Sequence, residues 1–325
     1  MSTDPDRSIE TLIRLAGERE MPSHEATTRA RDAARESWRR MLADKPSRAR
    51  PRLPLALAAA LMLIVLGWYA WTQREPAPPP VLIARVVTVD GAARIARGRD
   101  LQLAIRAADL TTGAILQTGA GRAAVTIANA LSLRLGYDTR LRFDGRDQVT
   151  LLQGSLYVDS GGLGIGPPLT IHTPAGEVRH IGTQFQIRVS GNATDIRVRE
   201  GRVALQRGGV VARTIAAGDA LEVRGSEERW QHGLPSFGAE WEWSASLAPP
   251  LAIEDRPLAE FLAWMAREHG WQLHFDDEAL QRQAQGIHLH GSLEGLDADA
   301  MLERVALVTG VPLDLDEGVL WVGKR

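Results

Sequence analysis

The chain has 325 residues, of which 44% are hydrophobic and 24% are charged, and its formal net charge at pH 7 is −2. This length exceeds one ordinary domain, and the composition excludes both a wholly disordered chain and a multispanning membrane protein. Cysteine is absent, which excludes disulfides, thiol nucleophiles and cysteine-based metal sites. We therefore expect two or three compact units joined by linkers.

The first fifty residues predict two short helices separated by a break at Pro22. Leu12, Ile13 and Leu15 form an apolar cluster on the first helix, and Trp38 lies on the second. So small a unit buries little surface alone, which leaves an apolar stripe for a partner helix. The alternative is an unstructured basic anchor beside a membrane.

The segment Leu53–Trp71 contains no charged residue. As a helix, with a rise of about 1.5 Å per residue, it matches the ~30 Å hydrocarbon core of a bilayer. Arginine and lysine gather before it and only Arg74 follows closely, which predicts a cytoplasmic N-terminus. We expect one transmembrane helix over residues 53–72, in preference to a buried core helix or a cleaved signal peptide.

Beyond the span, residues 73–84 form a Pro-rich linker, and the pattern then changes to short β-strands over residues 85–230. Apolar side chains alternate with polar ones, as at Phe185, Ile187 and Val189, and glycines separate the strands. This pattern predicts an all-β domain of roughly a dozen short strands, folded as a rolled sheet or a sandwich. Residues 231–248 are predicted to be a second linker.

Helical patterns return in residues 249–325. One predicted helix begins at Pro257 and ends at Gly270, and a second ends at Gly310, so that two similar units align at an offset of forty residues. Predicted strands around them give a small α+β domain of order βαββαβ. Residues 236–325 hold 6 Lys/Arg and 16 Asp/Glu, and this acidic balance argues for a separate domain and against direct nucleic-acid binding.

No pattern in the chain predicts chemistry. His288 and His290 share one face of a predicted strand, but a zinc site needs three or four ligands. The glycines of 161–166 are followed by prolines and open no helix, so they do not predict a dinucleotide site. We expect no catalytic residue, no metal and no cofactor, and we expect that the protein is not an enzyme.

Six motifs of the β region occur in the order typical of the FecR family of transmembrane regulators, which control extracytoplasmic-function sigma factors in Gram-negative bacteria. The motifs are Leu116–Gly119 leading into Gly121–Ile127, then Leu151–Val158, Ile171–Gly176, Ile181–Phe185, Val198–Val203 and Ala217–Asp219. The chain resembles this family from about residue 45 onward. Its C-terminal domain resembles the small domain at the N-termini of secretins and TonB-dependent receptors.

The resemblance implies a single-pass protein of the bacterial inner membrane, with residues 1–50 in the cytoplasm and the C-terminus in the periplasm. The periplasmic signalling domain of an outer-membrane receptor would contact the C-terminal domain, and the signal would reach a sigma factor. The resemblance also implies regulated proteolysis, with an intramembrane protease as a further partner. The candidate contacts are Leu12, Ile13, Leu15 and Trp38 for the sigma factor, and Ile287, Leu289, Leu320 and Trp321 for the receptor.

The N-terminal segment departs from the family pattern, because it is shorter than the usual cytoplasmic domain and lacks its Phe-x-x-Trp-Leu motif. Only Trp38, before two arginines, remains of that motif. The rival interpretation is therefore a membrane-tethered periplasmic binding or scaffold protein of the cell envelope without sigma-factor activity.

Overall fold

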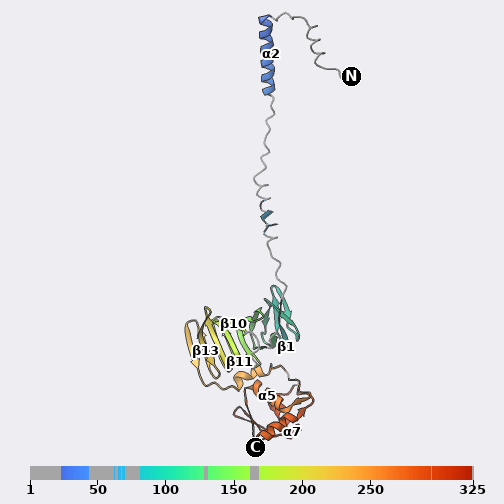
Figure 1. The fold of residues 1–325 in the computed structure, drawn as a ribbon, viewed down its shortest axis with the longest axis vertical. Helices are drawn as coiled ribbons and strands as arrows, with labels where there is room; N and C mark the ends of the chain where they lie inside the picture. Colours follow the sequence, from blue (N-terminus) through green and yellow to red (C-terminus); the bar gives the residue numbers. More distant parts are fainter. Residues whose placement is uncertain are drawn as a thin grey trace, which may run out of the picture. The chain divides into compact units, whose positions relative to one another are not determined.

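A computed structural model of the chain describes residues 23–43, 62, 65, 66, 68, 69, 81–127, 131–161, 168–249, 251–293 and 295–323. The chain divides into two compact units, Met1–Ala77 and Pro78–Arg325, which Figure 1 colours along the sequence.

The described part of the first unit contains helix α2 (His24–Ala43). Ser23 caps its first turn, because its hydroxyl accepts a hydrogen bond from the Ala26 amide at 3.4 Å. Trp38 and Met41 are 71% and 70% exposed. The apolar cluster at Leu12, Ile13 and Leu15 lies outside the described residues.

The predicted span over residues 53–72 lies mostly outside the described residues. Five of its residues are described and helical, namely Met62, Val65, Leu66, Trp68 and Tyr69. Across the described ranges, no helix combines the length and the apolar character that crossing a membrane requires. The transmembrane helix stays a prediction.

The β region of the second unit is one sheet of fifteen strands, with the main path β15-β14-β12-β11-β10-β9-β7-β6-β1-β4. Strands β2, β3, β5, β8 and β13 branch from this path, and β9 and β10 form a parallel pair. The strands are β1 (Leu82–Asp90), β2 (Arg94–Arg97), β3 (Asp100–Leu103), β4 (Asp109–Thr111), β5 (Ile115–Gln117), β6 (Arg122–Ile127), β7 (Ser132–Leu135), β8 (Arg140–Gly145), β9 (Gln148–Asp159), β10 (Thr170–Thr173), β11 (Gly176–Ser190), β12 (Ala193–Arg207), β13 (Val210–Ala216), β14 (Ala220–Arg224) and β15 (Glu227–Gln231).

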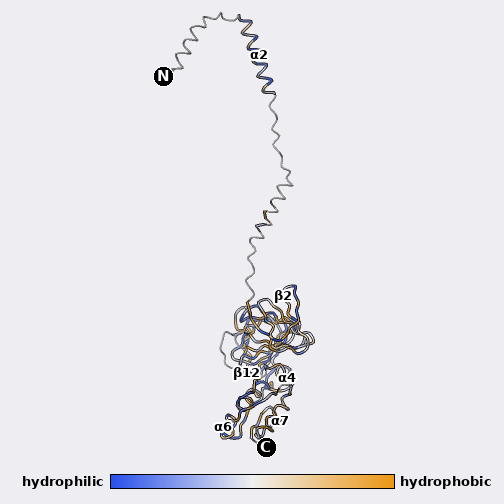
Figure 2. The backbone as a smooth tube through the Cα atoms, turned by 90° about the vertical axis from the view of Figure 1, so that its right-hand side faces the viewer, coloured by the Kyte–Doolittle hydropathy of each residue, from blue (hydrophilic) through white to orange (hydrophobic). Residues whose placement is uncertain are grey.

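The sheet rolls around a single apolar core, to which every strand from β1 to β14 except β3 contributes. Its buried side chains come from the alternating positions that the sequence pattern marked, including Phe185, Ile187 and Val189. The hydropathy colouring of Figure 2 accordingly mixes orange and blue throughout the strands. The predicted all-β domain is therefore confirmed as a rolled sheet.

The expectation of uniformly short strands is wrong for β11 and β12, which are 15 residues each. Ile196 and Val203 lie on one continuous strand, β12, although Gly201 stands between them. Gly201 has φ +79°, and a Cβ on it would lie 2.4 Å from the carbonyl oxygen of Gly182 on β11. Two motif glycines thus face each other and let a continuous hairpin bend without ending.

The C-terminal region has its own apolar core. It contains a two-stranded sheet, β16-β18, and a three-stranded sheet, β17-β20-β19. The elements are α4 (Ala239–Ala245), β16 (Arg256–Pro257), α5 (Leu258–His269), β17 (Gln272–Phe275), α6 (Glu278–Gly286), β18 (His288–Leu289), α7 (Ala298–Thr309), β19 (Leu313–Asp316) and β20 (Val319–Val322).

The predicted order βαββαβ is wrong in two places, because a helix, α6, is inserted and a further strand, β20, follows β19. The first strand lies at 256–257, directly after a turn in which Asp255 has φ +58°. The additional helix α6 separates the second and third strands. Asp277 begins α6 by accepting a hydrogen bond from the Leu280 amide at 2.7 Å, and Ala284 is its buried residue.

Helix α4 lies within residues 231–248, the segment predicted as a linker. Trp241 on this helix is 3% exposed, and Leu247 after it is 1% exposed. Both figures show α4 close to the β region and to the C-terminal helices. This part of the chain therefore packs as part of the folded unit.

Candidate functional site

The outward face of the sheet carries a row of polar side chains that are buried. Arg134 on β7 pairs in register with Tyr157 on β9, and Tyr157 pairs with Gln186 on β11. Their neighbours along each strand point into the apolar core, so this row faces the other way. These three residues are nevertheless 0%, 0% and 2% exposed, because α4 and the end of α5 cover them.

Arg134 connects both covering helices to the sheet. Its guanidinium lies 2.7 Å from Oε2 of Glu268 on α5 and donates a hydrogen bond to the carbonyl oxygen of Ser244 on α4 at 2.9 Å. It also lies over the Tyr157 ring, 5.1 Å from the centroid. The side chains of this ion pair are 0% and 7% exposed. Loss of either partner would leave a buried charge without its counter-charge.

Arg199 on β12 makes a second connection next to the first. Its guanidinium donates to the Tyr157 hydroxyl at 3.2 Å and to the carbonyl oxygen of Glu268 at 3.0 Å. It also donates to the carbonyl oxygen of Ser236 and lies 5.2 Å from the ring centroid of Trp241. The β region, the segment before α4 and the end of α5 therefore meet at one side chain.

Gly270 ends α5 at this point of contact. Its φ is +71°, and a Cβ there would lie 1.9 Å from the carbonyl oxygen of Ser236 and 2.4 Å from Nε of Arg199. The glycine that the sequence identified as a helix cap is thus also required for close packing against the sheet.

A third connection lies at the end of β9. Arg267 on α5 pairs with Asp159 and with Glu200, the latter at 2.8 Å. Gln184 donates to Asp159 at 3.1 Å and to the carbonyl oxygen of Arg267 at 3.3 Å. Gln184 belongs to the motif Ile181–Phe185, so this motif residue contacts the C-terminal region directly.

Burial sets the ionisation behaviour of the interface. Burial raises the pKa of Glu268, although the nearby Arg134 opposes the rise. Burial likewise raises the pKa of Tyr157 to about 12, so its hydroxyl stays neutral. Burial, together with the positive charge of Arg199, lowers the pKa of His269 to about 4. All three shifts follow from the close packing of the C-terminal region on the sheet.

The predicted receptor contacts fall partly in the core. Leu289 and Leu320 are 5% and 0% exposed, because Leu320 lies on the central strand of its sheet and both side chains belong to the C-terminal core. Neither side chain is exposed to a partner in this structure, and the receptor contact stays a prediction. Ile287 is half-buried, and the half-buried Trp321 lies edge-on to His274, with their ring centroids 4.5 Å apart.

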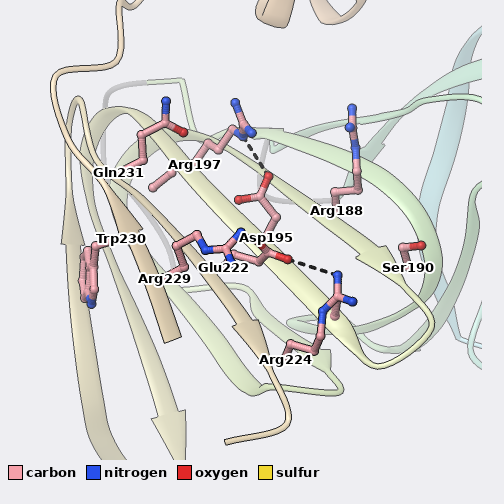
Figure 3. Close-up of a pocket in the computed structure, with 11 residues that line it drawn as sticks. Arg188, Ser190, Asp195, Arg197, Glu222, Arg224, Arg229, Trp230 and Gln231 are labelled. Carbon is pink, nitrogen blue, oxygen red and sulfur yellow. Dashed lines mark hydrogen bonds and ion pairs between the residues drawn. The ribbon is translucent and has the colours of Figure 1, made fainter. Parts of the chain in front are cut away.

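A separate hollow of about 420 Å³ lies over β11, β12, β14 and β15 (Figure 3). Arg197 pairs with Asp195 at 2.8 Å, and Arg224 pairs with Glu222 at 3.3 Å, as the dashed lines show. Both carboxylates of the hollow are therefore engaged. In the described ranges, no three His, Asp or Glu side chains form a group that could hold a metal ion.

The interface residues were not identified from sequence. Arg134 and Glu268 are 134 positions apart, and each looks like an ordinary solvated residue in its own element. The available signal was the pair of tryptophans in the segment predicted as a linker. Trp241 is buried, and Trp243 donates to the Gln186 side chain at 2.9 Å.

These contacts identify the site as an interface between the β region and the C-terminal region. Residues 110–204 match the sequence model of the FecR protein family, and for this similarity we call the stretch the FecR-type region. The match covers less than a third of the chain. It contains Arg134, Tyr157, Asp159, Gln184 and Arg199, which are the β-region side of the interface.

Among curated proteins, no match is found. Two crystal structures of a proposed anti-sigma factor from Parabacteroides distasonis are 16% and 15% identical to the chain. They cover 65% of this chain and 98% and 99% of their own, each with a TM-score of 0.34. A TM-score of this size does not establish a shared fold.

Proposed function

We propose that this protein is a single-pass regulator of the bacterial inner membrane that relays a periplasmic signal to a cytoplasmic extracytoplasmic-function sigma factor. The observation that carries the proposal is the FecR-type region at 110–204, because regulators of this family control such sigma factors. The C-terminal domain fixed to that region would receive the signal.

Membrane anchoring rests on the sequence. The uncharged run Leu53–Trp71 follows a cluster of basic residues and precedes a Pro-rich stretch, which orients the N-terminus to the cytoplasm. The FecR-type region and the C-terminal domain would then lie in the periplasm.

Helix α2 supplies the proposed cytoplasmic contact. Trp38 and Met41, three positions apart, lie on neighbouring turns and are 71% and 70% exposed. An exposed aromatic and an exposed methionine on one side of a helix would bury well in the groove of a partner.

The buried interface supports a relay through the periplasmic part. Arg134, Arg199 and Arg267 each connect the FecR-type region to α5. A partner that pulls or rotates the C-terminal domain would move the FecR-type sheet with it, since these buried connections resist separation.

Reporter fusions test the orientation. An enzyme that is active only in the periplasm should be active when fused after residue 85 and silent when fused after residue 45. In the same cells, deletion of residues 246–325 should abolish induction of the target genes, and the abundance of the truncated protein is measured alongside. The inverse fusion pattern, or a stable truncated protein that still responds to inducer, would contradict the proposal. The expected fusion pattern together with target genes that do not depend on the protein would favour a tethered envelope scaffold.

A further inference from the structure

The β2–β3 hairpin has an inverted distribution of polarity. Leu101, Leu103 and Ile105 are 54%, 68% and 66% exposed and alternate along one face. Gln102 pairs with Ile95, which is 2% exposed and belongs to the core. In an antiparallel edge strand with one solvated face, the outward positions are normally polar. Here they are aliphatic.

Arginines surround this aliphatic stripe. Residues 94–106 contain four arginines and one aspartate, so the segment has a net charge of +3. Arg97 donates to the carbonyl oxygen of Asp109. The other three arginines, at 94, 99 and 106, are exposed and have no carboxylate partner among the described residues. Aliphatic side chains next to unpaired arginines are typical of surfaces that bind anionic bilayers.

The hairpin lies at the end of the β region where β1 begins. Arg97 of the hairpin contacts Asp109, and the Asp109 carboxylate pairs with Arg85 at 2.8 Å. Arg85 lies near the beginning of β1, which starts at Leu82. Residues 73–81 separate the predicted span over residues 53–72 from β1, and an extended chain of that length covers roughly 35 Å at most. A tether this short keeps the hairpin within reach of the bilayer surface.

The surface next to the hairpin is also apolar. Val81 and Leu82 are 41% and 48% exposed. A hollow of about 570 Å³ beside them is lined mainly by apolar residues of β1, together with Ile127 and the unpaired Arg106. The aliphatic stripe therefore extends toward the start of the domain, where the chain from the membrane arrives.

We infer that the β2–β3 hairpin rests on the anionic phospholipid surface of the inner membrane, with Leu101, Leu103 and Ile105 in the interfacial layer and the arginines on lipid phosphates. This inference rests on the proposed membrane anchoring. A domain held by a single tether can rotate freely. The hairpin provides a second attachment, and it fixes the orientation of the FecR-type region on the bilayer.

The absence of cysteine allows a direct test by single labelling. The full chain carrying Leu103→Cys with a nitroxide label is reconstituted in vesicles of phosphatidylethanolamine and phosphatidylglycerol. Accessibility of the label to oxygen and to a water-soluble nickel chelate is then measured by electron paramagnetic resonance. The matched control is Val210→Cys on β13, where the native side chain is 69% exposed.

We expect the oxygen-to-nickel ratio at position 103 to be several-fold higher than at position 210, and to fall when phosphatidylcholine replaces the other lipids. Replacing Arg94, Arg99 and Arg106 with glutamine should lower it similarly. A water-like label at 103, in protein that floats with the vesicles, overturns the inference and leaves the proposed function intact. An oxygen-to-nickel ratio that changes with the protein-to-lipid ratio also overturns the inference, because it indicates that the hairpin contacts another copy of the protein. If the protein does not float with the vesicles, both the proposed membrane anchoring and this inference are overturned.

Discussion

Arg134 and Glu268 illustrate how one pair of residues can join two domains. The pair is buried, so Glu268→Ala leaves a guanidinium without its counter-charge. We expect this change to lower the free energy of unfolding by about 3–5 kcal/mol. The matched control is Asp109→Ala, which removes the exposed pair with Arg85 and should cost about 0–1 kcal/mol. Urea denaturation followed by tryptophan fluorescence measures both.

A double substitution separates the charge effect from packing. Replacing both partners with apolar residues, Arg134→Met with Glu268→Leu, should recover much of the stability, since no buried charge is then left alone. Equal losses for Glu268→Ala and Asp109→Ala would contradict a buried interface.

His269 predicts a pH dependence of stability. Its pKa is lowered to about 4 by burial and by Arg199, from an ordinary value of about 6.5. Between these values the unfolded chain binds more protons than the folded chain, so stability falls as the pH decreases from about 6.5 to about 4. Glu268, with its raised pKa, acts in the opposite direction, because its stabilising contribution is lost as the pH rises.

Replacing His269 with glutamine should therefore reduce the difference between the free energies of unfolding at pH 7 and pH 4.5. Denaturation at both pH values measures this difference for the native chain and the variant. An unchanged difference would mean that His269 does not titrate in this range.

Among the elements, the β11–β12 hairpin depends on its paired glycines. Gly201→Ala introduces a Cβ that would lie 2.4 Å from the Gly182 carbonyl oxygen, whereas Gly208→Ala, also at positive φ, places its Cβ in open space. The second change should cost about 1 kcal/mol and the first clearly more. Thermal unfolding compares the two, and equal effects would show that the hairpin does not bend at Gly201.

The sequence predicted the β region well, because alternating apolar positions report directly which side chains face a core. It did not predict the length of β12, since Gly201 looks like the end of a strand but lies where the pairing of β12 with β11 shifts register. The helices α4 and α6 were missed because each is short and has few buried apolar residues. The length of β12 and the presence of α4 and α6 depend on tertiary contacts, which the local sequence pattern does not report.

The candidate site was not predictable from local patterns. Arg134 occupies an outward position on a strand, where an arginine normally meets water. Its burial depends on α5, more than a hundred residues away. Gln184 lies in one of the motifs that carry the family resemblance. Its contacts with Asp159 and Arg267 join segments that are far apart in the sequence, so only the structure shows them.

The whole molecule combines three parts: an exposed helix in the first unit, a predicted span, and a FecR-type region in contact with a C-terminal domain. We propose that the exposed helix binds a sigma factor. The most exposed aromatic residue of α2, Trp38, should therefore matter more than its neighbour Ser37.

Purification of the tagged full chain in mild detergent, with mass spectrometry of bound proteins, tests this claim most directly. We expect an extracytoplasmic-function sigma factor to be recovered with the native chain and with Ser37→Ala, and to be reduced at least tenfold with Trp38→Ala, since burying an aromatic side chain contributes about 1.5–3 kcal/mol. Recovery of no sigma factor with the native chain, or equal recovery with all three proteins, would contradict the account.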